Sequence, residues 1–95
     1  MPKGYIIARA SIQDEGAYRA YADLARMAMQ KYGARILARG GKYEALEGDA
    51  RPRNVILEFE TFEAALQYWR SDEYQDARKH RIGAADIELC AVEGV

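Results

Sequence analysis

Both faces of the two most strand-like segments of this chain are apolar, and this feature constrains the fold more than any other. The segments are Tyr5–Ile12 and Arg53–Glu60. An antiparallel sheet with one face in water shows a clean alternation of apolar and polar residues. Because 95 residues are too few to cover both faces with helices of the same chain, we expect a second copy to cover the second face. The first face carries Ile6, Ala8, Ile12, Val55, Leu57 and Phe59, and the second carries Tyr5, Ile7 and Ile56.

Local signals divide the chain into strands and helices. Asp14, Thr61 and Ser71 are residues that commonly cap helix N-termini, and each precedes a segment with helical periodicity. The sequence predicts strands at Tyr5–Ile12, Ala34–Arg39, Tyr43–Leu46, Arg53–Glu60 and Ala84–Val92, a turn at Gly48–Pro52, and helices from Asp14 to Gly33, after Thr61, and from Ser71 to about His80.

This order of elements is strand, helix, strand pair, helix, strand. It predicts an α+β protein, a ferredoxin-like βαββαβ sandwich with a four- to five-stranded antiparallel sheet and its helices on one face. Residues 1–95 are expected to form a single domain. On the first helix, Tyr18, Tyr21 and Tyr32 form a stripe that we expect in the core, with hydroxyls that find hydrogen-bond partners.

The segment Arg39-Gly40-Gly41-Lys42 has the residue types of a phosphate-binding loop. Such a loop needs a glycine where Ile36 stands and a serine or threonine where Tyr43 stands, followed by a helix. Since none of these conditions is met, we interpret the glycines as a bulge or bend in a curved sheet.

Charge and composition exclude several partners. The net charge is −1, with 14 basic and 15 acidic residues, so we expect no nucleic-acid binding. Met1 to Gly4 lead into a strand without the apolar run of a signal peptide, and no stretch is long enough to span a membrane. The single cysteine, Cys90, can form no internal disulfide, which suits a reduced compartment. We therefore expect a cytoplasmic protein without membrane contact.

His80 and Cys90 are the two side chains with the widest chemical range. As the only histidine, His80 could be a haem ligand or a general base. Its neighbours Arg78, Lys79 and Arg81 favour a solvated helix end instead, because cations lower its basicity and repel metals. A buried, inert thiol is the favoured interpretation of Cys90. No metal site and no cofactor are expected.

Short motifs of one to four residues are spread over the whole chain. They are Gly4-Tyr5, Tyr18 with Tyr21, Tyr32-Gly33, Arg39-Gly40-Gly41, Leu46-Glu47-Gly48-Asp49, Arg51-Pro52, Glu58-Phe59, Ser71 with Tyr74, Arg81 and Val92-Glu93-Gly94-Val95. Together they resemble a small bacterial family, the domain-of-unknown-function family thirteen-thirty within the dimeric α+β barrel superfamily, and this resemblance implies pairing as a dimeric α+β barrel. The chain carries Ala50 where relatives often have an aromatic residue. The superfamily includes cofactor-free monooxygenases, haem enzymes, isomerases and stress-response proteins, so the fold leaves the reaction open.

Arg9, Arg39 and Glu58 form the candidate site. Strand alternation is expected to turn them toward the second face, where the partner copy would lie. One interpretation is a structural ion pair between Arg9 and Glu58 across neighbouring strands. The other is a pocket for a small anionic organic ligand, because arginine forks suit a carboxylate or an enolate. The other expected ligand-binding residues are Tyr5, Ile7 and Leu37.

Three functions are compatible with such a site. The first is a cofactor-independent monooxygenase or isomerase, in which Arg9 and Arg39 hold an oxyanion and Glu58 moves a proton. The second is a homodimer that binds a small ligand, or serves a stress response, without chemistry. The third is a haem-dependent activity, which would need an axial ligand.

Overall fold

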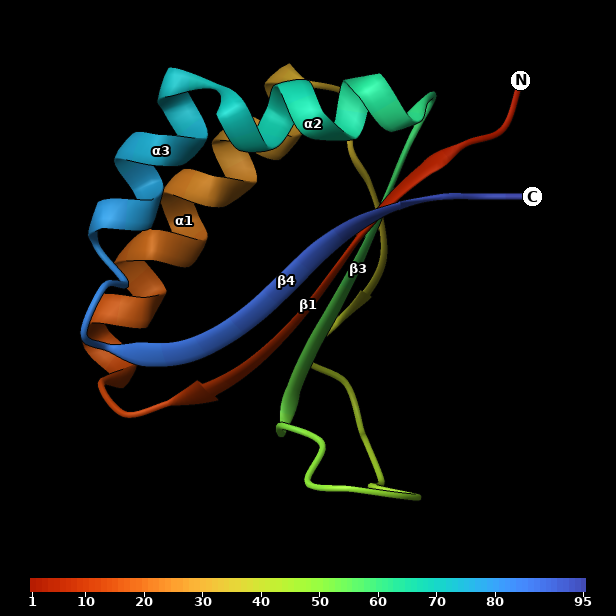
Figure 1. Cartoon of the computed structure of the whole chain (residues 1–95). Coiled ribbons are helices and arrows are strands. Elements are labelled where there is room, and N and C mark those ends of the chain that lie inside the picture. Colours follow the sequence, from red (N-terminus) through yellow and green to blue (C-terminus); the bar gives the residue numbers. More distant parts are fainter.

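A four-stranded antiparallel sheet with three helices on one face forms the molecule (Figure 1). The computed structural model describes residues 1–95. The strand order β2-β3-β1-β4 is that of a ferredoxin-like sandwich, as predicted. The elements are β1 (Gly4–Ile12), α1 (Glu15–Lys31), β2 (Arg35–Arg39), β3 (Arg53–Phe59), α2 (Phe62–Arg70), α3 (Asp72–Lys79) and β4 (Ala85–Glu93).

All three predicted helix caps are confirmed. The Asp14 carboxylate accepts a hydrogen bond from the backbone N–H of Ala17, and Thr61 and Ser71 cap α2 and α3 in the same way. Ser71 both ends α2 and begins α3, so the two helices follow one another with a sharp change of direction. None of the three helices is both long and apolar enough to cross a membrane.

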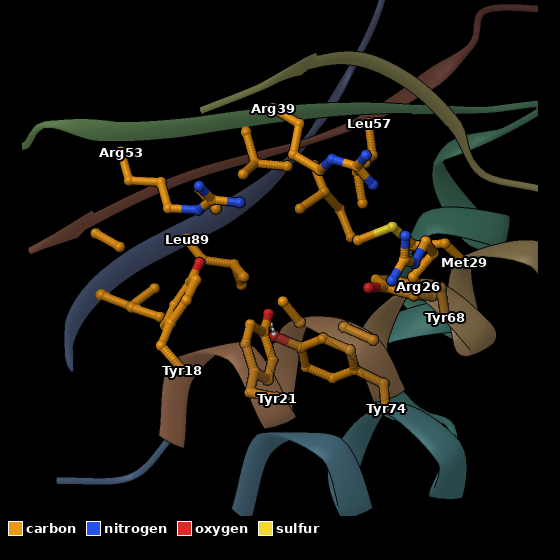
Figure 2. Close-up of a pocket in the computed structure, with 17 residues that line it drawn as sticks. Tyr18, Tyr21, Arg26, Met29, Arg39, Arg53, Leu57, Tyr68, Tyr74 and Leu89 are labelled. Carbon is orange, nitrogen blue, oxygen red and sulfur yellow. Dashed lines mark hydrogen bonds between the residues drawn. The ribbon is translucent and has the colours of Figure 1, made fainter. Parts of the chain in front are cut away.

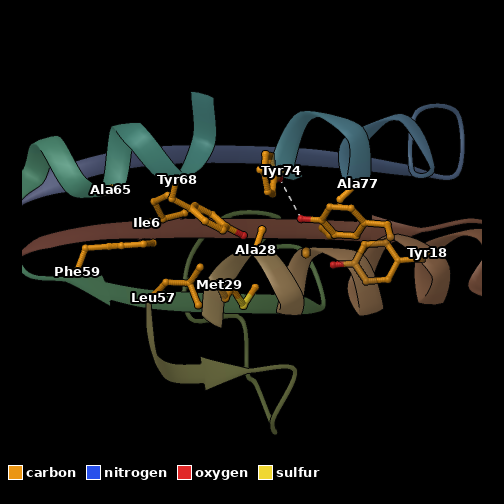
Figure 3. Close-up of a cluster of buried hydrophobic side chains, with 13 residues drawn as sticks. Ile6, Tyr18, Ala28, Met29, Leu57, Phe59, Ala65, Tyr68, Tyr74 and Ala77 are labelled. Atoms are coloured by element: carbon orange, nitrogen blue, oxygen red, sulfur yellow. Dashed lines mark hydrogen bonds between the residues drawn. The ribbon is translucent and has the colours of Figure 1, made fainter. Parts of the chain in front are cut away.

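The core lies between the sheet and the helices (Figure 3). Leu57 and Phe59 of β3 meet Tyr68 of α2 and Tyr74 of α3, and these four side chains are nearly inaccessible. Helix α2 comes close to β1 because Gly4 has no side chain. A Cβ at Gly4 would lie 2.3 Å from the carbonyl oxygen of Thr61. The whole chain measures 37 × 32 × 17 Å, and the smallest of these dimensions fits one sheet and one layer of helices.

The predicted strand at Tyr43–Leu46 is wrong. Chain segment 40–52 forms a loop that projects from the body at the end of β2 (Figure 1). Gly40 turns the chain out of the sheet with a φ of 65°, and the residues beyond it are largely exposed. The glycines therefore mark a bend, as expected, but the bend leads into a loop rather than into a second stretch of sheet.

The sheet face away from the helices, called here the outer face, is partly apolar. Ile7 lies opposite Ile56 on one neighbouring strand and opposite Cys90 on the other. Val92 is 44% exposed on the same face. Cys90 is exposed in the single chain, so the expectation of a buried thiol is not met without a covering partner.

Candidate functional site

A β-bulge at Leu37 reverses the side on which Arg39 lies. Ile36 is opposite Leu57 and Ala38 is opposite Ile56, so one extra residue stands between consecutive pairs. Arg39 consequently pairs with Val55 and points to the helix side of the sheet. The placement of Arg39 beside Arg9 and Glu58 on the outer face is therefore wrong. Leu37 itself is 51% exposed at the bulge.

A cavity of about 190 Å³ lies between the helix face of the sheet and α1 (Figure 2). Helix α1 packs mainly against α3 and stands off the strands, which leaves this space open. Fourteen of the 17 lining residues are hydrophobic. The lining is Ile6, Ala8, Ala10, Tyr18, Tyr21, Ala22, Ala25, Arg26, Met29, Arg39, Arg53, Val55, Leu57, Tyr68, Tyr74, Ile87 and Leu89.

Three arginines are the only charged residues that line the cavity. Arg53 stacks on the ring of Tyr18, with 5.3 Å from its guanidinium carbon to the ring centroid, and its Nε is buried without a hydrogen-bond partner. Arg39 forms no ion pair, whereas Arg26 pairs with Asp23 on the exposed side of α1 at 2.9 Å. The cavity wall contains no carboxylate, imidazole or thiol. Its electrostatic character is therefore cationic.

Tyrosine hydroxyls form a buried network at the helix side of the cavity. The hydroxyls of Tyr21 and Tyr74 are 3.0 Å apart, and a guanidinium nitrogen of Arg81 donates to the Tyr74 oxygen at 3.2 Å. The Arg81 guanidinium also lies over the Tyr21 ring, 5.1 Å from its centroid. Burial raises the pKa of Tyr21 and of Tyr68, so both are protonated at neutral pH.

The tyrosine stripe was predicted correctly for the core positions Tyr18 and Tyr21, and the hydroxyl of Tyr32 donates to Glu73 at 3.0 Å. Sequence reasoning missed Arg53 and Arg81. The sequence places Arg81 in a basic cluster and among the family motifs, but it assigns no role in the site to it. His80, in contrast, is the exposed C-cap of α3 and lies outside the cavity lining.

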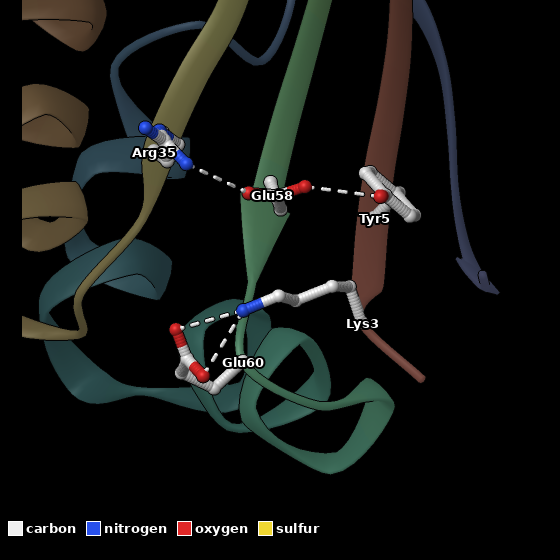
Figure 4. Close-up of polar contacts among 5 residues, drawn as sticks. All are labelled: Lys3, Tyr5, Arg35, Glu58 and Glu60. Carbon is white, nitrogen blue, oxygen red and sulfur yellow. Dashed lines mark hydrogen bonds and ion pairs between the residues drawn. The ribbon is translucent and has the colours of Figure 1, made fainter. Parts of the chain in front are cut away.

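Glu58 on the outer face is held by Tyr5 and Arg35 (Figure 4). The Tyr5 hydroxyl donates to one carboxylate oxygen at 3.0 Å, and Arg35 lies 3.6 Å from the other. This hydrogen bond raises the pKa of Tyr5. Glu58 therefore already has two partners within the chain.

The predicted ion pair between Arg9 and Glu58 does not form. In the β1–β3 register Arg9 stands opposite Asn54, four residues from Glu58 and thus roughly 13 Å along the strand. Tyr5, Ile7, Arg9 and Glu58 do share the outer face as expected, while Arg39 lies on the other side of the sheet. The expected six-residue site is thus split between two faces.

These features define a ferredoxin-like α+β protein with a cationic, mainly apolar cavity between its sheet and its helices. The family model described as a domain of unknown function (DUF1330) matches residues 3–95. The chain belongs to this family, which confirms the resemblance seen in the sequence motifs. None of the curated proteins matches the chain.

Several solved structures share the fold. A protein of unknown function from Rhodopseudomonas palustris is 19% identical with a TM-score of 0.77, over 99% of this chain and 83% of the other. A dimeric protein of unknown function with a ferredoxin-like fold, from Bacteroides fragilis, is 13% identical with a TM-score of 0.65 and coverages of 96% and 95%. A protein from Caulobacter crescentus, described as a putative antibiotic biosynthesis monooxygenase, is 10% identical with a TM-score of 0.62 and coverages of 99% and 91%. At these identities the likeness concerns the fold alone.

Proposed function

We propose that this protein binds a small anionic organic molecule in the cavity between the sheet and α1. The observation that carries the proposal is the presence of Arg39 and Arg53 in a mainly apolar cavity without an acidic partner. Small-ligand sites are commonly built in this way, with apolar walls and a few polar groups that fix the orientation. The planar fork of arginine suits a carboxylate. The partly buried Arg53, whose Nε has no hydrogen-bond partner, would gain the most from an anion that pairs with it.

The cavity suits a ligand with one aromatic ring or an unsaturated chain. Its volume of about 190 Å³ equals the liquid volume of roughly six water molecules. Without a ligand, the apolar side chains that line this space lack van der Waals contacts on the side that faces the cavity. A ring between the strands and Tyr18 and Tyr21 would recover these contacts, so an aromatic or unsaturated acid is the favoured class.

Binding is the function that the side chains support best, because the cavity wall supplies no carboxylate, imidazole or thiol as a base. A cofactor-independent monooxygenase or isomerase is the second candidate. The likeness to putative antibiotic biosynthesis monooxygenases favours it, and arginines that hold an oxyanion are compatible with it. In that case the substrate would arrive already ionised, since Glu58 lies on the outer face.

The outer face is proposed to join two copies in a homodimer. Ile7, Ile56 and Val92 are apolar residues there without covering elements, and one structure of the same fold is described as dimeric. Stable dimers of this kind commonly bury at least about 2,000 Å². In that case Tyr5, Arg9 and Glu58 would belong to the dimer interface rather than to the ligand site. A cytoplasmic location stays a prediction from the single cysteine.

The proposal is tested by thermal unfolding in the presence of benzoate, cinnamate and their neutral amides. An acid present at about a hundred times its Kd should stabilise the protein by about 2.7 kcal/mol, a shift on the order of 10 °C for a chain of this length. The amides should have little effect. Arg53→Met and Arg39→Met should each reduce the shift.

Arg9→Met is the matched control, because it removes an arginine from the outer face and leaves Glu58 paired with Tyr5 and Arg35. It should keep the shift. Loss of the shift in Arg9→Met but not in Arg53→Met would place the site on the outer face and refute the proposal. Oxygen uptake in the presence of a stabilising acid separates the monooxygenase from the binding protein.

A further inference from the structure

We propose that the Tyr21 hydroxyl is the hydrogen-bond donor of the cavity, held in that role by Arg81 through Tyr74. The ligand would accordingly carry, besides its carboxylate, an oxygen acceptor such as a carbonyl. This inference rests on the proposed ligand-binding function. It adds a second recognition point and assigns a positioning role to Arg81.

The direction of the hydrogen bonds follows from the number of donors and acceptors. Arg81 can only donate, so the Tyr74 oxygen accepts from it. Tyr74 is 1% exposed, and its only other hydroxyl partner is Tyr21 at 3.0 Å. The Tyr74 proton is therefore satisfied only if it is donated to Tyr21. Tyr21 then accepts, and its own proton is left for the cavity that it lines.

The positive charge of Arg81, at the far end of this chain of hydroxyls, makes the Tyr21 hydroxyl a stronger hydrogen-bond donor. The buried Arg81 guanidinium has no carboxylate partner, and its Nε forms no hydrogen bond. Its positive charge polarises the Tyr74 and Tyr21 hydroxyls in turn, because linked hydrogen bonds in a low-dielectric interior reinforce one another. All the charged groups that surround the cavity are cations, with Arg26, Arg39 and Arg53 in its wall and Arg81 behind it. These cations favour a ligand that presents electron-rich acceptor groups to the cavity wall.

The two recognition points lie on opposite sides of the cavity. Figure 2 shows Arg39 and Arg53 on the side of the sheet and Tyr21 with Tyr74 on the side of the helices. A ligand that bridges the cavity would place its carboxylate at the arginines and its second oxygen at Tyr21. An aromatic acid that carries an acyl group has this pattern.

The test compares 4-acetylbenzoate with 4-isopropenylbenzoate, and the corresponding 3-substituted pair. The two members of a pair differ only in a carbonyl oxygen that is replaced by a methylene group. Dissociation constants are measured by calorimetry for the wild type, Tyr21→Phe, Tyr74→Phe and Arg81→Met. Tyr32→Phe is the control, because it removes a tyrosine hydroxyl that lies outside the cavity.

For at least one pair, the affinity ratio of acetyl to isopropenyl compound should fall about three- to tenfold in Tyr21→Phe. It should fall by less in Tyr74→Phe and Arg81→Met, where Tyr21 can still donate but is no longer polarised, and Arg81→Lys should restore part of it. Tyr32→Phe should leave the ratio unchanged. Affinity for the isopropenyl compounds should be similar in wild type and Tyr21→Phe.

Infrared spectroscopy of the wild type tests the inference even if a variant folds poorly. The acetyl carbonyl of acetylbenzoate is isotope-labelled so that its infrared stretch can be assigned. The frequency of this stretch should be lower for the acid bound to the wild type than for the acid in a water-free solvent, because the carbonyl accepts a hydrogen bond in the cavity. An unshifted stretch in the wild type, an unchanged ratio in Tyr21→Phe, or a loss of preference in Tyr18→Phe instead, would overturn the inference while leaving acid binding intact. If none of the four acids binds although benzoate or cinnamate does, the inference is overturned; if benzoate and cinnamate fail as well, the proposed function itself fails.

Discussion

The guanidinium of Arg53 occupies the space in which a side chain at Gly40 would stand. A Cβ at Gly40 would lie 2.5 Å from Nη1 of Arg53 and 3.1 Å from its guanidinium carbon. The glycine that resembles part of a phosphate loop therefore admits an arginine to the cavity and turns the chain out of β2 with a positive φ. Its role is to position a cation rather than to bind phosphate through its backbone.

Gly40→Ala should weaken the binding of aromatic acids and lower stability. The positive φ costs a side chain roughly 1–2 kcal/mol, and the new Cβ displaces the Arg53 guanidinium. Gly48→Ala is the matched control, since Gly48 has a φ of 77° but open space around it. Urea unfolding and acid titration of both variants should show a similar loss of stability but a loss of affinity only in Gly40→Ala. Equal affinities would contradict the role given to this contact.

Gly4→Ala should destabilise the protein strongly, by roughly 3 kcal/mol, because its Cβ would meet the backbone of Thr61 and Phe62 at 2.3–2.6 Å. A backbone at the start of a capped helix cannot move aside as a side chain can. Gly16→Ala in the first turn of α1 meets only an ordinary contact at 3.6 Å and should stabilise by about 0.5–1 kcal/mol. Chemical denaturation measures both. A Gly4→Ala protein as stable as wild type would refute the close packing of β1 on α2.

Ile7→Asp should convert the proposed dimer into monomers. Ile7 lies at the middle of the apolar outer face between Ile56 and Cys90, and an unpaired carboxylate there is costly to bury. Light scattering at micromolar concentration should give a mass near twice the 10.7 kDa of one chain for wild type and near one chain for the variant. Gln30→Asp, on the exposed side of α1, should remain dimeric. A monomeric wild type would refute the proposed homodimer.

Glu73 should make stability depend on pH in the acid range. Hydrogen bonds from Lys31, its own backbone and Tyr32 lower the pKa of Glu73 from 4.5 to about 2. Because the folded pKa is below the unfolded one, the contribution is fully present above about pH 4.5 and disappears as the pH falls toward 2.

The melting temperature of Glu73→Gln should therefore lie below that of wild type at neutral pH, and the difference should vanish near pH 2. Glu44→Gln in the loop 40–52, which removes an exposed carboxylate that has no ion pair, is the matched control. A constant difference between Glu73→Gln and wild type at all pH values would contradict the lowered pKa.

The sequence by itself determined the three helices, the four strands and their order, although it also predicted a strand at Tyr43–Leu46 that does not form. The caps at Asp14, Thr61 and Ser71 act within three residues of the chain, and the tyrosine stripe follows from the helical repeat. The alternation of Ile6, Leu57 and their neighbours places one strand face in the core in the same local way. Such signals need no knowledge of distant residues, so the ferredoxin-like fold could be read from them.

Only the tertiary structure decided which side chains form the site. One extra residue at Leu37 moves Arg39 to the helix side, and no local sequence pattern indicates this bulge. The register between β1 and β3 places Asn54, and not Glu58, opposite Arg9. Side chains alternate with every residue along a strand, so a shift of a single position reverses the face and a shift of a few removes a contact. The cavity arises in the same manner, because the docking of α1 on α3 leaves it away from the sheet, and that distance depends on contacts between residues about 50 positions apart, such as Tyr21 and Tyr74.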